Sequence, residues 1–146
     1  MPHQKKGNTL VKASLTPGIG TTKRIVVDRD RTIGFMGEEG RVYATPELLR
    51  DIEQTCRDFL LEHLDADEDT VGARVELDHT APTLAGMWVE IAVTVADVQG
   101  RSVVLEITAR DPLDTICKAR HGRFVVGVAK TVERLKAKAA KAAALA

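Results

Sequence analysis

One amphipathic helix, followed at once by segments of alternating hydrophobicity, is the feature that most constrains the fold of this 146-residue chain. Thr45-Pro46 opens the helix, because threonine is a good N-cap and proline is favoured at the first helical position. From Leu48 to Leu64 apolar residues recur at helical spacing and form one broad stripe. A curved antiparallel sheet wrapped around the helix is the economical way to bury that stripe. The sequence therefore predicts an α+β fold with one long central helix.

The segments after the helix change to a period of two, which is typical of strands. Val75, Leu77 and His79 share one face of the first such segment, and Pro82 ends it. Alternating residues on both sides of Gln99-Gly100 predict an antiparallel hairpin. Further strands are expected over residues 10–15, 23–27 and 115–132, the last one bent at Gly122 or Gly127. A sheet of this kind, open at one edge, commonly pairs with a second copy.

The length fits one domain with a substantial core. We assign residues 10–135 to that domain, residues 1–9 to a disordered lead, and residues 136–146 to an Ala/Lys-rich tail that is either a frayed helix or disordered. Residues 28–41 contain three glycines and several acidic residues, which predicts a mobile loop. A long loop in a compact domain is often a lid or a binding segment.

Composition excludes several classes of function. The 21 basic and 21 acidic residues give a formal net charge of zero, which favours neither nucleic acid nor an anionic membrane as partner. The sequence contains no apolar run long enough to span a bilayer and no signal peptide, so we expect a cytoplasmic protein. Cys56 and Cys117 have no metal-binding spacing, and we expect buried, reduced thiols and no metal.

Three residues form a candidate catalytic site. Thr45 is an alcohol at the start of the helix, Glu53 lies at the border of its apolar stripe, and His79 ends a strand on the core-facing side. A histidine between a hydroxyl and a carboxylate is suited to acyl transfer, because the carboxylate orients the imidazole and the imidazole activates the hydroxyl or a water. Each residue also has a structural interpretation: Thr45 as a cap, Glu53 as a solvated residue and His79 as a structural histidine.

A second pattern, from Asp65 to Glu76, places acidic residues at positions 1, 3, 5 and 12 of a calcium loop. Thr70 occupies the position where the loop requires glycine, and the segment that follows alternates like a strand. A solvated helix-to-strand turn is therefore the favoured interpretation.

The stretches from Val42 to Glu53 and from Leu77 to Pro82 resemble the fluoroacetyl-CoA thioesterase family of hot-dog-fold proteins. The shared motifs are an Ala-Thr at the helix start, a Glu eight residues later and a His-Thr-Ala on the following strand, in the same order and spacing. The resemblance covers roughly residues 10–135 and continues through the segment from His121 to Val125.

This resemblance implies a homodimer of hot-dog domains that hydrolyses a small acyl-CoA without metal or cofactor, at a site on the subunit interface. It places the catalytic groups at Thr45, Glu53 and His79, with Gly72 and Arg123 near the acyl group. His79 would act as general base and acid, oriented by Glu53, and Thr45 would be either nucleophile or water-positioning group. The alternatives are a non-catalytic acyl-CoA or small-ligand binding protein and an enoyl-CoA hydratase on the same fold.

The resemblance fails in two regions that bear on the substrate. One is the helix, which is more charged here, because Pro46, Glu47, Arg50 and Asp51 stand where the relative has smaller or apolar residues, and the other is the lid before it. The family member that acts against fluoroacetate carries phenylalanines in a lid before the helix, whereas the matching residues 36–40 are not aromatic and only Phe35 stands before them. Selectivity for fluoroacetyl is therefore not implied. The tail lysines at 130, 136, 138 and 141 could serve the phosphates of CoA or simply keep the tail soluble.

Overall fold

The structure, a computed structural model, describes residues 11–145. Its regular elements in chain order are β1 (Gly20–Val26), β2 (Thr32–Ile33), β3 (Val42–Tyr43), α1 (Thr45–Leu61), β4 (Glu68–His79), β5 (Trp88–Gln99), β6 (Ser102–Arg110), β7 (Thr115–Gly127) and α2 (Val128–Ala143). Two short 3-10 helices, η2 (Arg29–Arg31) and η3 (Glu38–Gly40), lie in the segment predicted as a mobile loop.

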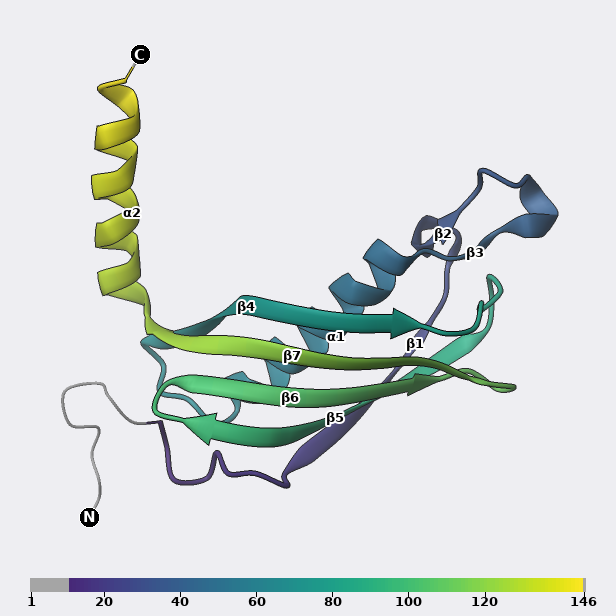
Figure 1. Cartoon of the computed structure of the whole chain (residues 1–146), viewed down its shortest axis with the longest axis horizontal. Coiled ribbons are helices and arrows are strands. Elements are labelled where there is room, and N and C mark those ends of the chain that lie inside the picture. Colours follow the sequence, from purple (N-terminus) through teal and green to yellow (C-terminus); the bar gives the residue numbers. More distant parts are fainter. Residues whose placement is uncertain (1–10, 146) are drawn as a thin grey trace.

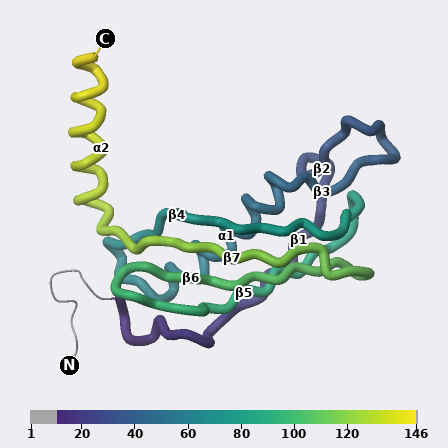
Figure 2. Tube along the Cα trace, viewed as in Figure 1, coloured from purple at the N-terminus to yellow at the C-terminus, as the bar shows by residue number. Residues whose placement is uncertain are grey.

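One antiparallel sheet with strand order β1-β5-β6-β7-β4 wraps around α1 (Figures 1 and 2). The core lies between the helix and the concave face of the sheet. Leu48, Ile52 and Leu60 of α1 and Ile91 and Leu105 of the sheet are fully buried there. This arrangement confirms the predicted α+β fold with a sheet around one central helix.

The start of α1 differs from the sequence-based expectation. Thr45 is itself the first helical residue, and Ala44 occupies the N-cap position. Among the described residues, no side chain makes a capping hydrogen bond at this end. The prediction that Thr45 caps the helix is therefore wrong, because its hydroxyl pairs instead with His79 from the end of β4. The helix ends at Leu61, and a turn carries the chain on to Leu64.

The hairpin predicted around Gln99-Gly100 is confirmed. Strands β5 and β6 pair from Glu90 with Arg110 to Gln99 with Ser102. Gly100 turns the chain with a φ of 61°, a left-handed conformation that glycine adopts at little cost.

One predicted strand is wrong, and another is confirmed except at its end. Residues 11–15 form a turn rather than a strand, and Leu10 lies outside the described residues. The last strand, β7, ends at Gly127 rather than Val132, and α2 follows directly. Val128, Val132 and Leu135 recur at helical spacing among alanines and lysines, which are good helix formers. That helix crosses the boundary predicted between residues 135 and 136 and stands away from the sheet (Figure 1).

Strand β4 forms one edge of the sheet and carries a β-bulge. It pairs with β7, but the register shifts between Gly72 and Arg74, which leaves Ala73 as the extra residue. Along its other side no strand from residues 11–145 pairs with β4. Val71 and Val75 are consequently exposed although they are apolar.

Both cysteines are buried and free, and burial raises the pKa of Cys56 to about 12. Within the described part of the chain, no helix is both long and apolar enough to cross a membrane.

Candidate active site

The centre of the candidate site is a contact between the first residue of α1 and the last residue of β4. The hydroxyl Oγ1 of Thr45 lies 2.8 Å from Nδ1 of His79. The two residues are 34 positions apart in sequence, and packing of α1 against the end of β4 brings them together. The pair predicted from the sequence is therefore in hydrogen-bonding contact.

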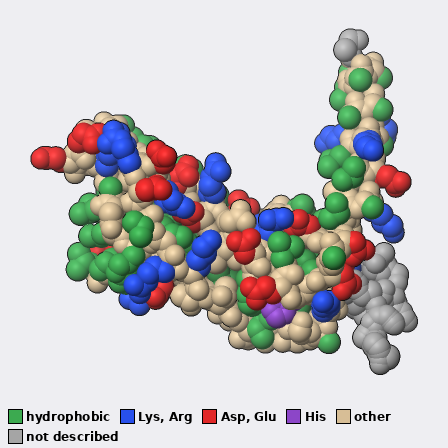
Figure 3. Space-filling model, turned by 180° about the vertical axis from the view of Figure 1, so that it is seen from behind, with side chains coloured by type: hydrophobic (Ala, Val, Ile, Leu, Met, Phe, Trp, Pro, Cys, Tyr) green, Lys and Arg blue, Asp and Glu red, His purple; other side chains and the backbone are tan. Residues whose placement is uncertain are grey.

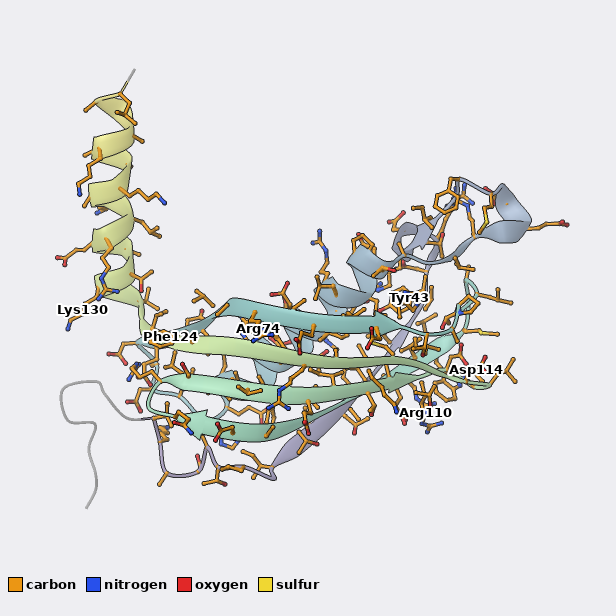
Figure 4. The ribbon with its side chains drawn as sticks, in the orientation of Figure 1. Tyr43, Arg74, Arg110, Asp114, Phe124 and Lys130 are labelled. Carbon is orange, nitrogen blue, oxygen red and sulfur yellow. The ribbon has the colours of Figure 1, made fainter. Side chains whose placement is uncertain are left out.

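A polar cluster beneath the pair fixes the start of α1. Arg31 donates two hydrogen bonds to the carboxylate of Asp51, from Nε at 2.8 Å and from Nη2 at 3.1 Å. The Tyr43 hydroxyl donates to the same carboxylate, and burial raises the pKa of that phenol. The Tyr43 ring meets the His79 ring edge-on, with centroids 6.5 Å apart (Tyr43 is labelled in Figure 4). The imidazole is thus packed between a fixed aromatic ring and the helix start.

A hollow of about 380 Å³ opens over Thr45 and His79. Its lining is mostly apolar and comes from three places: the β2–β3 segment, the helix start and the chain after β4. Phe35 at its rim is 75% exposed. Exposed apolar side chains gather at this end of the molecule, away from α2 (Figure 3). Such a hollow is suited to a small apolar group next to a nucleophile.

The environment of His79 favours an uncharged imidazole. Burial lowers the pKa of His79, and the backbone of Ala81 acts in the opposite direction. Its Nδ1 faces Thr45, but its Nε2 is the one buried side-chain nitrogen or oxygen in the described chain that lacks a hydrogen-bond partner. Such an atom costs free energy unless another group meets it, so Nε2 marks the place of a missing partner.

Glu53 belongs to a second cluster, two turns further along α1. Its carboxylate oxygen Oε2 lies 3.6 Å from Nη1 of Arg123 and 3.8 Å from Nε2 of His121, both on β7. Gly72 on β4 makes room for it, because a Cβ at that position would approach Oε2 to 2.6 Å. The side chain of Glu53 is still 43% exposed, at the wall of a hollow of about 420 Å³ that also contains Arg123.

The five predicted site residues therefore fall into two groups within one chain. Thr45 and His79 form the first group, and Glu53, Gly72 and Arg123 form the second. The two hollows adjoin, since Pro46 lines both.

His121 was not among the predicted site residues, and the structure places it in the second group. Its position two residues before Arg123 on a strand could have identified it, because that spacing puts both side chains on one face of the strand.

Three of the four acidic residues at the ligand positions of the suspected calcium loop pair with basic side chains. Asp65 lies 3.6 Å from Lys12, Asp69 accepts two hydrogen bonds from Arg57, and Glu76 pairs with Arg74. In residues 11–145 no group of three or more histidine, cysteine or acidic side chains is placed to hold a metal ion. The calcium pattern thus corresponds to a turn and the start of β4.

Comparison with known proteins gives a consistent result. The sequence model of the fluoroacetyl-CoA-specific thioesterase family matches residues 26–129. The fluoroacetyl-CoA thioesterase of Streptantibioticus cattleyicolor is 27% identical over 127 residues, which are 82% of this chain and 91% of that protein.

Solved structures extend the likeness to the fold. A hypothetical protein of Thermus thermophilus, described as a thioesterase superfamily member, superposes with a TM-score of 0.80 at 26% identity, over 88% of this chain and 96% of its own. A single-residue mutant of the fluoroacetyl-CoA-specific thioesterase gives 0.79 at 25% identity, over 87% and 99%. That mutant has also been solved with fluoroacetate and CoA bound. These matches confirm the hot-dog fold expected from the sequence.

Proposed function

Because the chain belongs to the fluoroacetyl-CoA-specific thioesterase family and is therefore a thioesterase, we propose that it hydrolyses a short acyl-CoA with Thr45, His79 and Glu53, in a site shared by two subunits. The observation that carries the proposal is the unpartnered Nε2 of His79 beside a fully formed contact with Thr45.

The chemistry follows from the two nitrogens of one imidazole. With Nδ1 unprotonated, His79 accepts the proton of the Thr45 hydroxyl, or of a water held by it, as that oxygen attacks the thioester carbonyl. Nε2 then carries a hydrogen and needs an acceptor, which a carboxylate supplies while stabilising the imidazolium. The carbon–sulfur bond then breaks and the proton passes to the departing CoA thiolate, while the positive end of α1 faces the developing oxyanion. Attack by water releases the free acid directly. Attack by Thr45 leaves an acyl-threonine ester, which a water hydrolyses as His79 takes its proton and returns it to the Thr45 oxygen. No cofactor takes part, because a thioester is already activated towards water.

A second copy supplies that carboxylate in our proposal. The free edge of β4 can pair with β4 of another chain in antiparallel fashion and extend the sheet. A two-fold axis between Val75 and Glu76 sets position 72 of one chain opposite position 79 of the other. Glu53, which lies against Gly72, would then approach His79 of the second copy. The exposed apolar Val71 and Val75 would be covered by the same pairing.

The hollow over Thr45 and His79 supports a short acyl group. Its volume of about 380 Å³ must also admit the thioester, and Phe35 is the one aromatic residue that residues 28–41 contribute to its lining. Met36, Glu38 and Glu39 stand where the resemblance implies phenylalanines, and Phe35 points into solvent for most of its surface. We therefore propose acetyl-CoA and similarly small thioesters as substrates, without marked preference for the fluorinated one.

A substrate panel tests the activity. The wild-type protein, His79→Ala and the matched control His63→Ala are incubated with acetyl-, propionyl-, butyryl- and fluoroacetyl-CoA, and free thiol is measured. His63 bonds Ser14 far from the site, so its loss should leave turnover unchanged. We expect turnover by the wild type and by His63→Ala only. Absence of turnover on every substrate, or equal rates in all three proteins, would contradict the proposal.

Mixing two inactive proteins tests whether the site is shared. Glu53→Gln and His79→Ala homodimers are unfolded together and refolded. Each heterodimer then contains one site with both wild-type groups if Glu53 and His79 come from different chains, so about a quarter of wild-type activity should return on random pairing. A site within a single chain would regain no activity on mixing.

A further inference from the structure

His121 is the most enclosed polar residue near the site, and no role has been assigned to it above. It lies on β7 with 1% of its surface exposed. In the sheet it is flanked by Val75 of β4 and Leu105 of β6. Burial of an imidazole at this depth requires that both nitrogens be satisfied, and both are.

The two contacts fix the tautomer of His121. Nδ1 lies 2.8 Å from the carbonyl oxygen of Arg74, which can only accept, so Nδ1 carries the hydrogen. Nε2 lies 3.1 Å from Nη1 of Arg123, and a guanidinium can only donate, so Nε2 is the bare acceptor. The ring is therefore neutral, which agrees with the lowering of its pKa by burial.

The contact with Arg74 ties the ring to the β-bulge. Arg74 is the first residue after the register shift in β4, and it is labelled on that strand in Figure 4. Gly72, the last residue before the shift, pairs with Arg123 on β7. The bulge therefore sets the positions of the ring, of the guanidinium and of the glycine that accommodates Glu53.

The guanidinium of Arg123 is held on three sides. Nε donates to the Thr70 hydroxyl at 2.8 Å, Nη2 donates to the Thr70 carbonyl at 3.0 Å, and Nη1 donates to His121. The second hydrogen of Nη1 is not used in these contacts and can point towards Glu53, whose Oε2 lies 3.6 Å from Nη1. Thr70 and His121 thus leave the guanidinium one orientation, in which the unused N–H of Nη1, one of two that remain, lies towards the carboxylate.

We infer that His121 is a positioning residue. Its unprotonated Nε2 accepts a hydrogen bond that orients Arg123. Arg123 in turn holds the carboxylate of Glu53 in the position from which it can bond to His79. This inference rests on the proposed function for its last step. His121 acts through Arg123 alone and never touches the substrate. Its loss should consequently lower kcat more than it changes KM.

Two amide substitutions separate the two contacts. In His121→Gln the amide oxygen can occupy the place of Nε2 and accept from Arg123, whereas in His121→Asn the shorter amide can replace only Nδ1. We expect His121→Asn to lower kcat for acetyl-CoA roughly tenfold to a hundredfold with KM within about threefold, and His121→Gln to recover most of the loss. Equal losses in both variants, with equally lowered melting temperatures, would mean a merely structural residue and overturn the inference.

A double-mutant cycle tests the route through Arg123. In an Arg123→Gln background, His121→Asn should cause no further loss of kcat. Additive losses would show that His121 acts independently of Arg123 and would overturn the inference. His63→Asn is the matched control, and its kcat should equal that of the wild type.

A spectroscopic measurement tests the contact between His121 and Arg123 without a measurement of turnover. Long-range ¹H–¹⁵N spectra of the ¹⁵N-labelled wild type report the protonation of each ring nitrogen. We expect His121 to be neutral with the hydrogen on Nδ1 at pH 7, and the Nε2 resonance to shift in Arg123→Gln. A charged ring, or a hydrogen on Nε2, would overturn the inference. Lack of turnover by the wild type would refute the proposed hydrolysis, and this spectrum would still decide whether His121 orients Arg123.

Discussion

His79 and His121 are both histidines of the β4–β7 pair, and burial lowers the pKa of both, yet their surroundings differ in one decisive respect. Both nitrogens of His121 have partners, one on the backbone of β4 and one on Arg123. His79 has a partner on Nδ1 only, and Nε2 has none among the described residues. An imidazole whose two nitrogens both have hydrogen-bond partners is held in place by its neighbours. An imidazole with one buried nitrogen that lacks a partner can still form a hydrogen bond with a further group. In our proposal, His121 therefore fixes geometry and His79 carries out the chemistry.

The largest effect expected from the comparison is loss of activity without loss of fold. His79→Ala should lower kcat/KM about 100-fold to 10,000-fold, because the general base is removed. Its melting temperature should change by only a few degrees, because within its own chain the ring makes one hydrogen bond, to Thr45, and one edge contact, with Tyr43. Thiol release and thermal unfolding of the same preparation measure both. A large drop in melting temperature would place His79 with the structural histidines.

The second effect concerns the free energy of unfolding. His121→Ala removes the side chain that donates to the buried Arg74 carbonyl and one of the three buried partners of the Arg123 guanidinium, so we expect a loss of about 2–4 kcal/mol. Urea unfolding at pH 7.5 measures the loss. His63→Ala removes a histidine whose bond to Ser14 is exposed and should lose clearly less. Equal losses would mean that the His121 contacts contribute little.

The third effect distinguishes a reacting hydroxyl from a helix cap. Thr45→Ala should lower kcat/KM about tenfold to a hundredfold, and Thr45→Ser should retain most of the activity. Loss of a capping side chain costs about 0.5–2 kcal/mol, but Ala44 holds the cap position here, so the unfolding free energy should fall only by what the hydrogen bond to His79 contributes, about 1 kcal/mol. A loss of about 2 kcal/mol or more would restore the structural interpretation of Thr45.

The smallest effect is a pH dependence. In the unfolded chain a histidine titrates near pH 6.5, and folding lowers the pKa of His79 and His121. Below about pH 6.5 the unfolded chain therefore binds more protons than the folded one, and the free energy of unfolding decreases as the pH is lowered. Each unit of pKa difference contributes at most about 1.4 kcal/mol. We expect His121→Gln to flatten the decline between pH 7 and pH 5, and the acid limb of kcat/KM to lie below pH 6.5.

The parts of the fold that depend on local pattern could be predicted from the sequence. The stripe on α1 and the alternation around Gly100 each specify an element. The contact between Thr45 and His79 was expected from the family resemblance of their motifs, because a local pattern does not show which strand end meets the helix start. The change from β7 to α2 was missed, because valines and glycines up to Val132 look like a strand until the helical spacing beyond them is weighed.

The surroundings of Glu53 and His121 could not be predicted in the same way. They depend on the bulge at Ala73, which shifts β4 by one residue relative to β7. A bulge leaves little trace in hydrophobic alternation, because β4 is an edge strand with both faces exposed over residues 71–76. The pairing of Arg123 with Gly72 therefore became visible only in three dimensions.

Helix α2 has a practical consequence for handling the enzyme. It begins beside the start of β4, runs for 16 residues or about 24 Å, and none of its residues 128–143 is buried. It lines neither of the two hollows around Pro46 among the residues the structure describes. A fluorophore or a surface tether attached at its far end would thus sit on a rigid arm well clear of the chemistry. Immobilised through that arm, the protein would present its open end to the solution.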